Sequence, residues 1–505
     1  MAQGVFDVNL QDTAFPMLFE QQTHTYINTK DASRQVHLAY CHNVMPTKYG
    51  LQSIDYDFRI PMLLGTTPET YFDDVRVIFA TNKTRCHLAL RLDGSLMVLR
   101  EGWTNWDLAI VHTNPVRPLP TTFSSNDITI ANVNGISYIF YKNFGCFVLD
   151  LTLDTNLVEV ELLGLITEDF LGITGSVGYL IAYTESAIAW SSTINPLDFV
   201  PSQVTGAGGG NIADVNGEIK FITYNSTGLL IYAKSNVVSG TYTGNSQFPF
   251  KFREVADSKG GLGLDLVAYE ANSTAQYAFS RAGLQAINSQ RADLILPEVS
   301  DFLEGQRFED FNEATNEFER TYLGSAQTMR RKLKLINSRY LAISYSLPDS
   351  AFYTHALVFD KVLQKLGKLK FDHVDVFELN LDQLAGASGS LALVTTKGAV
   401  YSVGLSSAYG SGVAILGSVA FSPTRLTTLL EVHTDNSVVG GAFSIVDLAA
   451  LDGKNPTPVV GTQAFRESRL TKHVFRTTAK AHNIAVKGNF DLVNCTITYT
   501  ISGRR

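Results

Sequence analysis

Most of the chain alternates polar with apolar side chains at every second position and is rich in Thr, Val, Ile, Tyr and Phe. Because successive side chains of a β-strand point to opposite faces, this pattern predicts half-buried strands. The range 496–501, Thr-Ile-Thr-Tyr-Thr-Ile, is the clearest example. We therefore expect an all-β fold.

Turn dipeptides separate the expected strands, and their spacing predicts a repeat. Hairpin turns are expected at Asp93-Gly94, Asn134-Gly135 and Asn216-Gly217, with later candidates at 282–283 and 397–398. Asn134 follows Asp93 by 41 residues and Asn216 follows Asn134 by 82, so a middle turn would fall near Gly175 and Gly178. A repeat of roughly 40 to 45 residues is typical of a β-propeller, whose four-stranded blades bury their faces against neighbouring blades. Chance spacing in a β-sandwich is the alternative.

Two segments depart from the strand pattern. The range 298–319 holds eight acidic residues and one base, which is consistent with an amphipathic helix or an acidic excursion from a blade. The range 329–334 carries four positive charges in six residues. It could form a basic strand edge that discourages aggregation, or it could contact phosphate.

The pattern predicts a β-propeller-like fold with an additional β-rich C-terminal module. Residues 1–80 would form an N-terminal segment and the start of the propeller. Residues 81–410 would form the propeller blades, and residues 411–505 a C-terminal β module that closes the fold.

Composition limits the classes of protein that this chain can belong to. Its 505 residues are 45% hydrophobic, which excludes a disordered, collagen-like or disulfide-dense chain. The net charge of −8 argues against a general nucleic-acid coat, because non-specific binding to phosphate needs a surplus of Lys and Arg. The range 464–505 carries a net charge of +6, so the other 463 residues carry −14.

The four cysteines and the N-terminal sequence indicate a reducing compartment and no membrane insertion. Cys41, Cys86, Cys146 and Cys495 form no C-x-x-C pair, so neither a disulfide framework nor a cysteine zinc site is expected. A basic region followed by an apolar run, as in a signal peptide, is absent from the first residues. No apolar stretch is long enough to predict a membrane span.

The sequence shows no catalytic, cofactor or metal motif. The pairs Cys41-His42 and Cys86-His87 could each offer only one ligand to a shared zinc site, because neighbouring side chains of a strand point apart. No G-x-S-x-G elbow or catalytic-cysteine signature is present. The glycine-rich range 206–210 lacks the Lys-Ser/Thr of a phosphate loop and predicts a flexible or tight loop. Consecutive acids at 73–74 and 309–310 do not face each other, so we expect no enzyme.

The segment around Trp190 resembles a known family. Ala189-Trp190-Ser191-Ser192, followed by Asn195-Pro196-Leu197-Asp198-Phe199, is similar to the W-S…P-x-D-F signature of the tail-hub, or nozzle, proteins of short-tailed bacteriophages, also called packaged-DNA stabilisation proteins. From the residues alone, Trp190 lies on a strand face, Pro196 and Asp198 favour a turn, and Phe199 returns to the core. Further similar segments are 217–240, 339–369 and 488–505, so the resemblance covers roughly residues 85–505.

The resemblance implies a structural virion protein of the phage tail, assembled in the bacterial host cytoplasm. Such a chain would form a homo-hexameric ring below the portal and adaptor, contact other tail proteins, line the exit channel for double-stranded DNA and help to retain the packaged genome. Acidic residues outside 464–505 would line the lumen and repel phosphate, while the basic end of the chain would face neighbouring subunits. No cofactor and no metal are implied.

The alternative is a phage-tail propeller enzyme or a carbohydrate-binding module. Its site would be a pocket at the propeller mouth with convergent carboxylates and aromatic rings. Trp103 and Trp106 would then be the candidates for stacking on sugar, although two aromatic residues near a strand end more often pack in a core.

Overall fold

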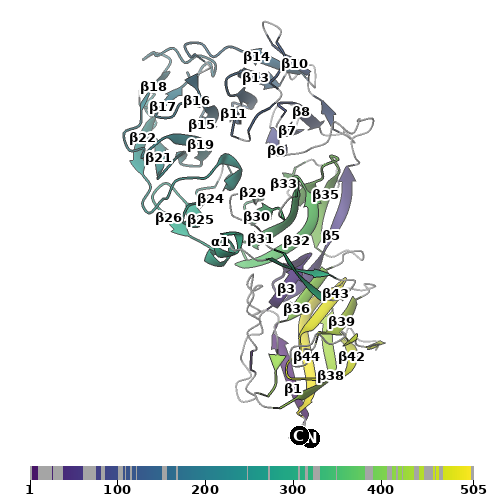
Figure 1. Cartoon of the computed structure of the whole chain (residues 1–505). Helices are drawn as coiled ribbons and strands as arrows, with labels where there is room; N and C mark the ends of the chain where they lie inside the picture. Colours follow the sequence, from purple (N-terminus) through teal and green to yellow (C-terminus); the bar gives the residue numbers. More distant parts are fainter. Residues whose placement is uncertain are drawn as a thin grey trace.

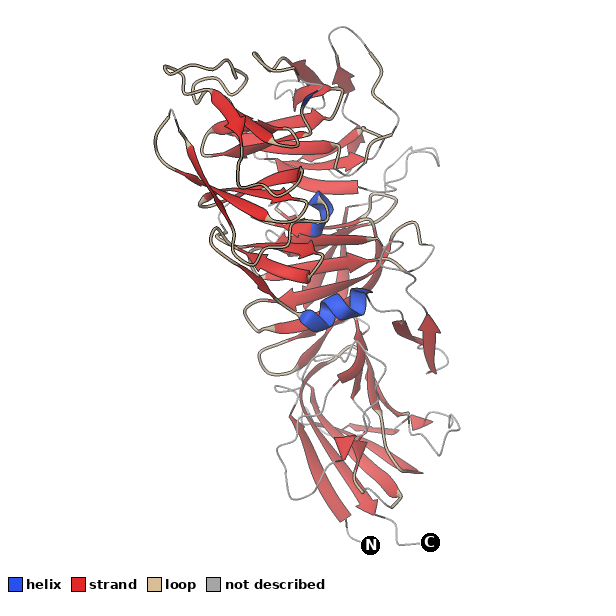
Figure 2. Ribbon diagram, turned by 60° about the vertical axis from the view of Figure 1, so that its left-hand side comes forward, coloured by secondary structure: helices blue, strands red, loops and turns tan. Residues whose placement is uncertain are grey.

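A computed structural model describes the chain over most of its length. The described residues are 3–9, 25–26, 38–60, 75–80, 86–91, 93–100, 106–108, 110–113, 117–120, 122–124, 126–149, 156–166, 169–246, 248–270, 273–304, 308–312, 317–321, 330–347, 350–380, 390–405, 412–416, 419–422, 425–436, 443–448, 459–460, 462–465 and 470–501. They form an elongated molecule with a β-propeller at one end and a smaller β-sandwich at the other, where both chain ends lie (Figures 1 and 2).

The described strands of the propeller form seven blades, each an antiparallel sheet of four strands, with one additional strand in blade 2. Blade 1 contains β6 (Val75–Ala80), β7 (Cys86–Arg91), β8 (Leu96–Arg100) and β9 (Asp107–Leu108). Blade 2 contains β11 (Ile128–Val133), β12 (Ile136–Tyr141), β13 (Gly145–Leu149) and β14 (Asn156–Val160), with β10 (Ile110–His112) parallel to β14. Blade 3 contains β15 (Gly172–Ser176), β16 (Tyr179–Tyr183), β17 (Ala187–Trp190) and β18 (Gly208–Asn211).

Blades 4 to 7 follow in chain order, apart from the last strand of the ring. Blade 4 contains β19 (Ile219–Asn225), β20 (Gly228–Ala233), β21 (Val237–Tyr242) and β22 (Phe250–Glu254), and blade 5 contains β23 (Val267–Ala268), β24 (Gln276–Ser280), β25 (Gly283–Ile287) and β26 (Ala292–Leu294). Blade 6 contains β29 (Arg331–Ile336), β30 (Tyr340–Tyr345), β31 (Tyr353–Asp360) and β32 (Lys365–His373). Blade 7 contains β33 (Asp375–Leu379), β34 (Ser390–Val394), β35 (Val400–Leu405) and β5 (Leu51–Ile60).

The second strands of several blades are buried along their whole length. In β16 and β20 every side chain is buried, because both faces of a blade contact neighbouring blades. The period-two alternation is therefore lost in these strands, and they read as short continuous apolar runs. The fold class expected from the sequence, an all-β propeller with a further β-rich module, is confirmed by this strand order.

An N-terminal strand closes the ring of blades. The second half of β5 pairs antiparallel with β35, from Ile54 opposite Leu405 to Ile60 opposite Val400. The first half of β5 pairs with β4 (Val44–Pro46) and, at Leu51 and Gln52, with β44 (Asp491–Ile501) of the sandwich. One strand therefore joins the propeller to the sandwich through continuous backbone hydrogen bonding.

The sandwich is built from both ends of the described chain. One sheet contains β1 (Gln3–Asn9), β44, β38 (Thr427–Asn436), β42 (Leu470–Ala479) and β41 (Thr462–Phe465); the other contains β3 (Leu38–His42), β36 (Gly412–Leu416), β43 (Ile484–Gly488), β39 (Phe443–Asp447) and β40 (Val459–Val460); β2 (Thr25–Tyr26) pairs with β37 (Val419–Ala420). A single apolar core between the two sheets includes Val8, Ile445 and Ile497.

The structure divides the first 80 residues between the two units. The sequence predicts an N-terminal segment and the start of the propeller in residues 1–80, and a β module that closes the fold in residues 411–505. Strand β6 begins the propeller within the first range, and the described strands after residue 411 belong to the sandwich. The boundaries differ because β1 and β3 also complete the sandwich and β5 completes the last blade. The physical reason is that strand pairing over long sequence separations leaves no local mark in the sequence.

The expected turns have mixed outcomes. Asp93-Gly94 joins β7 to β8 and Asn134-Gly135 joins β11 to β12, as predicted. The expected middle turn is Val177-Gly178, between β15 and β16. Asn216-Gly217 is not a hairpin turn, because it lies in the segment that connects blade 3 to blade 4. The three turns that suggested the repeat therefore occupy different places in their blades.

The acidic range 298–319 combines the two forms that we considered. Its first part belongs to the helix α1 (Pro297–Glu304), which packs on β25. Its second part contains β27 (Phe308–Asn312) and the start of β28 (Glu317–Thr321), which form a separate two-stranded hairpin. The range is thus an excursion between blades 5 and 6 that begins with a short helix.

We expect the propeller to lose stability as the pH falls from about 6.5 to about 4, because of His373 in blade 6. Nδ1 of His373 donates to the carbonyl of Phe371 at 2.6 Å, and Nε2 accepts from the Ser344 hydroxyl at 2.8 Å, so the ring is neutral. Burial lowers the pKa of His373 from 6.5 to about 4. The unfolded chain therefore binds one more proton in this window, at a cost of about 2 to 3 kcal/mol.

This dependence can be measured by urea unfolding at pH 7 and pH 4. Between pH 7 and pH 4 the free energy of unfolding of the variant His373→Gln should fall by less than that of the wild type. His112→Gln is the matched control, since His112 is exposed. An equal loss in wild type and His373→Gln would contradict the assignment.

Candidate functional site: the central cavity of the propeller

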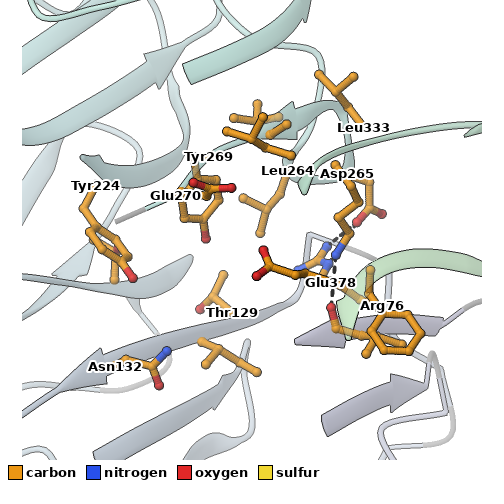
Figure 3. A pocket seen from close by; sticks show the side chains of 18 of the residues that line it. Arg76, Thr129, Asn132, Tyr224, Leu264, Asp265, Tyr269, Glu270, Leu333 and Glu378 are labelled. Carbon is orange, nitrogen blue, oxygen red and sulfur yellow. Dashed lines mark hydrogen bonds and ion pairs between the residues drawn. The ribbon is translucent and has the colours of Figure 1, made fainter. Parts of the chain in front are cut away.

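A cavity of about 380 Å³ lies on the axis of the propeller, where the first strands of all seven blades converge. Its lining includes residues from each blade, among them Arg76, Thr129, Thr174, Tyr224, Tyr269, Lys334 and Glu378. Figure 3 shows the side chains of Arg76, Thr129, Tyr224, Tyr269 and Glu378 around it. A ring of inner strands produces such a site without any single motif, because each strand contributes only two to four residues.

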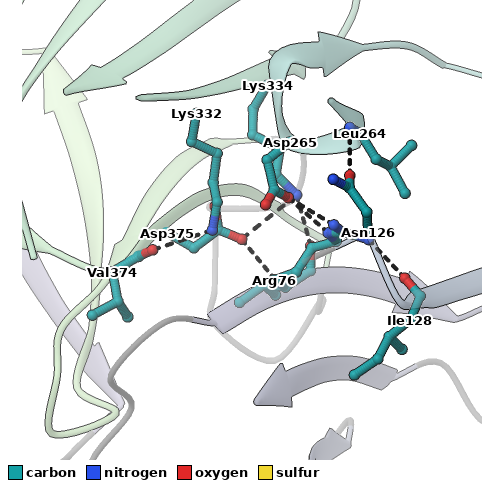
Figure 4. Close-up of polar contacts among 10 residues, drawn as sticks. Arg76, Asn126, Ile128, Leu264, Asp265, Lys332, Lys334, Val374 and Asp375 are labelled. Carbon is teal, nitrogen blue, oxygen red and sulfur yellow. Dashed lines mark hydrogen bonds and ion pairs between the residues drawn. The ribbon is translucent and has the colours of Figure 1, made fainter. Parts of the chain in front are cut away.

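An ion pair crosses the cavity at one end. Arg76 in β6 of blade 1 contacts Asp265 through two nitrogens, Nε at 2.9 Å and Nη2 at 2.8 Å. Asp265 lies in the short 3-10 helix η3 (Leu264–Leu266) that precedes blade 5, which is not a neighbour of blade 1. Arg76 also donates to the carbonyl of Ile128 at the start of blade 2. Through these contacts Arg76 ties three blades together (Figure 4).

A second charge cluster surrounds Asp375, which is fully buried at the start of blade 7. Its carboxylate accepts from the backbone N–H of Val77 at 2.6 Å and lies 3.5 Å from Nζ of both Lys332 and Lys334. Lys334 also donates to the carbonyl of Val77 at 3.1 Å. Burial lowers the pKa of Lys334, and the nearby Asp375 opposes that shift. The cluster joins blades 6, 7 and 1 (Figure 4).

This cluster explains the basic run at 329–334. Strand β29 is the inner edge strand of blade 6, as one of our two interpretations supposed. Lys332 is only 2% exposed, however, and both Lys332 and Lys334 contact the carboxylate of Asp375. They are therefore not available to phosphate, and the phosphate interpretation of these two lysines is wrong.

Two carboxylates and two tyrosines also line the cavity. Glu378 accepts from the backbone N–H of Asn337 at 2.9 Å, and Glu270 accepts from the backbone N–H of Ser338 at 2.6 Å and from the Ser338 hydroxyl. Asn337 and Ser338 form the tight turn between β29 and β30, with φ values of 49° and 50°. The rings of Tyr224 and Tyr269 meet edge to face at 5.8 Å.

The motif residues expected from the sequence form a corner of blade 3, away from the cavity lining. The turn after Trp190 is closed by the N–H of Asp198, which donates to the carbonyl of Asn195 at 3.0 Å, with Pro196 inside the turn. Phe199 is buried and its N–H donates to the carbonyl of Leu163. Pro196, Asp198 and Phe199 therefore form the turn and the return to the core, while Trp190 packs against a different apolar cluster.

Trp190 is only partly buried, which lowers the cost of its removal. Its indole Nε1 donates to the carbonyl of Gly206 at 2.9 Å, and its ring lies edge to face with Phe250 at 6.4 Å. We expect Trp190→Ala to cost about 2 kcal/mol, less than full burial would give. Urea unfolding measures this change in the free energy of unfolding. A decrease of more than about 4 kcal/mol, or no decrease at all, would contradict this prediction.

The other sequence candidates for chemistry belong to the core or lie outside the described residues. Trp106 is 3% exposed and donates to the carbonyl of Gly398 at 2.9 Å, so it packs in the core, as is more frequent for such residues, and its ring is not available to a sugar. Trp103 and the acids at 73–74 lie outside the described residues. The glycines at 208–210 form the outer strand β18 and not the loop that we expected, and Gly208 packs beneath the ring of Trp190.

The cysteines are buried and unreactive by their surroundings. Burial raises the pKa of the thiols of Cys41, Cys146 and Cys495 to about 12, and that of Cys86 to about 11. Cys41 and Cys86 belong to different apolar cores. Within the described residues no three His, Cys, Asp or Glu side chains group as a metal site. No helix in the described ranges is long and apolar enough to cross a bilayer.

Comparisons with known proteins leave the family open. No protein-family profile matches the chain, and no curated protein matches it. Among solved structures it is similar to the WD40 β-propeller domain of Doa1, at 9% identity and a TM-score of 0.39 over 69% of this chain and 97% of that chain. It is also similar to the Cps50 (Swd1) β-propeller domain of Myceliophteria thermophila, at 10% identity and a TM-score of 0.38 over 68% of this chain and 100% of that chain.

A further similar structure is the extracellular domain of a hybrid two-component system from B. thetaiotaomicron, at 12% identity and a TM-score of 0.40 over 83% of this chain and 50% of that chain. At these values the likeness says nothing of function. The propeller is established by the strand pairing of the chain itself.

The residues around the cavity could not have been found as a site in the sequence. Arg76 and Asp265 are 189 residues apart, and each looks like an ordinary charged residue of a strand or a turn. The basic run at 329–334 was the one signal that marked part of the cavity lining. Its partner Asp375 carries no local signal.

Proposed function

We propose that this chain is a structural subunit of a short-tailed phage tail, a nozzle or tail-hub protein that forms a homo-hexameric ring below the portal and adaptor. In this role it would contact other tail proteins in the virion, enclose the exit path for double-stranded DNA and help to retain the packaged genome. It would need no cofactor and no catalytic residues.

The observation that carries this proposal is an exposed apolar surface beside the motif residues. We call this group of exposed apolar side chains, in the loops that follow β14 and β17, the rim patch; it consists of Leu163, Ile166, Ile194, Val200 and Val204, of which Val204 is 91% and Ile194 80% exposed. The loops are held firmly: Leu163 N–H donates to the carbonyl of Leu197, and Ile194 and Val204 lie in turns closed by serine hydroxyls. Ordered apolar surface of this kind is typical of a protein contact.

The central cavity supports a passage between subunits. At about 380 Å³ the cavity is far too small to hold a DNA double helix. The major groove of that helix is by itself wide enough to admit an α-helix. The ion pair of Arg76 and Asp265 also lies in its lining. A channel for DNA would therefore have to be enclosed by several copies of the chain, as a ring requires.

The oligomeric state tests the proposal. Size-exclusion chromatography with light scattering should show a closed ring, and negative-stain images should show an open lumen. The double variant Ile194→Asp, Val204→Asp should shift the population to monomer, whereas Val362→Asp should not, because Val362 is 72% exposed in the β31–β32 turn outside the rim patch. A monomer at every concentration would reject the proposal.

The charge of the lumen is a separate part of the proposal. If acidic residues outside 464–505 line the passage, the DNA can slide because its phosphates are repelled. A structure of the ring with a lumen rich in Lys and Arg would reject sliding while leaving the ring itself intact.

A further inference from the structure

Two carboxylates of the cavity lining contact no cation within the described residues. Within the described residues, Glu270 and Glu378 make only the contacts to Asn337 and Ser338, and neither forms an ion pair. Backbone N–H groups stabilise a carboxylate, but they do not neutralise its full charge. The side of the cavity next to the β29–β30 turn is therefore suited to a positively charged ligand.

The positive side chains of the lining contact other carboxylates. Arg76 lies against Asp265, and Lys334 lies against Asp375, which also contacts Lys332. Together with Glu270 and Glu378 these groups leave one excess negative charge around the cavity, which a cationic ligand could neutralise.

Two aromatic residues stand beside these carboxylates. Tyr224 and Tyr269 line the cavity, and within the described part of the chain their hydroxyl groups make no hydrogen bond (Figure 3). Burial raises the pKa of both, that of Tyr269 to about 12, so they are neutral at physiological pH. A neutral phenol offers an oxygen acceptor and an aromatic face, both of which favour an ammonium group.

We propose that the central cavity binds a small aliphatic amine, with its ammonium group against Glu270 and Glu378 and its carbon chain against the rings of Tyr224 and Tyr269. A volume of about 380 Å³ is within the usual range for small-molecule sites. The proposal goes beyond the ring-forming role and does not depend on it.

Calorimetric titration of the full chain with 1,4-diaminobutane tests this site. Saturable binding of one diamine per chain is expected, with no binding of butane-1,4-diol or of glucose. Equal binding of the diol would show a neutral polar pocket, and binding of glucose alone would favour a carbohydrate site. Either result, or no binding of any compound, would overturn the proposal.

Variants place the ligand in the cavity. Glu378→Gln keeps an oxygen acceptor for the Asn337 N–H but removes the charge, and should weaken diamine binding roughly tenfold. Tyr224→Phe should weaken it by about two- to fivefold through loss of one acceptor. Glu218→Gln is the matched control, because Glu218 is an exposed carboxylate paired with Lys220 on the surface.

The outcomes separate the site from the fold and from the ring. The thermal unfolding of each variant is measured without ligand by circular dichroism. A loss of binding is then interpreted only for variants that are folded at the temperature of the titration. Unchanged affinity in folded Glu378→Gln would place the amine elsewhere and reject the site. Ring formation is measured independently by light scattering, so a monomer that binds diamine would reject the ring and keep this inference.

Discussion

Replacing Asp375 with alanine should lower the free energy of unfolding by about 3 to 5 kcal/mol. The substitution would leave the ammonium groups of Lys332 and Lys334 without their shared carboxylate in a site where Lys332 is 2% exposed. It would also remove the acceptor of the Val77 N–H in blade 1. Breaking a buried ion pair costs this much because the remaining charge cannot return to water.

Urea unfolding followed by circular dichroism measures this effect. Asp375→Asn should lie between wild type and Asp375→Ala, because the amide still accepts hydrogen bonds but carries no charge. Asp293→Ala is the matched control: Asp293 pairs with Arg291 on the surface, both more than half exposed, and its removal should change stability by less than about 0.5 kcal/mol. A loss below about 1 kcal/mol for Asp375→Ala would mean that the lysines find other partners.

Trp106→Ala should cost about 3 to 5 kcal/mol as well, since it empties a large volume in the core between blades 1 and 7. Trp106 is 3% exposed and packs with residues of both blades, among them Met97 and Val400. Its indole N–H also donates to the carbonyl of Gly398 in the β34–β35 turn. The substitution therefore weakens the contact at which the ring of blades closes.

Trp190→Ala is the natural comparison for this variant, because both changes remove an indole that donates to a backbone carbonyl. The two should differ by about 1 to 3 kcal/mol in urea unfolding, since Trp190 is partly exposed and Trp106 is not. Equal losses would show that burial does not set the difference. If Trp106→Ala leaves the free energy of unfolding unchanged, Trp106 does not pack in the core and is again a candidate for binding a ligand.

Local pattern was enough to predict the strands and the class of fold. The alternation at 496–501 corresponds to the end of β44, and the Asn134-Gly135 turn joins β11 to β12 as expected. These features depend on side chains within a few residues of one another. The W-S…P-x-D-F segment was also interpreted correctly as a strand, a turn and a return of Phe199 to the core.

The cavity depends on relations that local pattern does not contain. Whether Lys332 is a solvated edge residue or a buried cation is decided by Asp375, which is 43 residues away and in another blade. The ion pair of Arg76 and Asp265 needs the whole ring to form before the two side chains meet. Sequence-level reasoning placed aromatic candidates at Trp106, whereas the tyrosines that line the cavity come from blades 4 and 5.

The closure of blade 7 by β5 has a consequence for synthesis on the ribosome. Ile60 is made 340 residues before its partner Val400. At about 5 to 20 residues per second, this strand waits on the order of 20 to 70 seconds for the sheet that it completes. A nascent chain with six blades is an open arc whose first and last blades each expose an apolar face, and β5 lacks its partner β35. These surfaces can contact other chains until the last blade emerges.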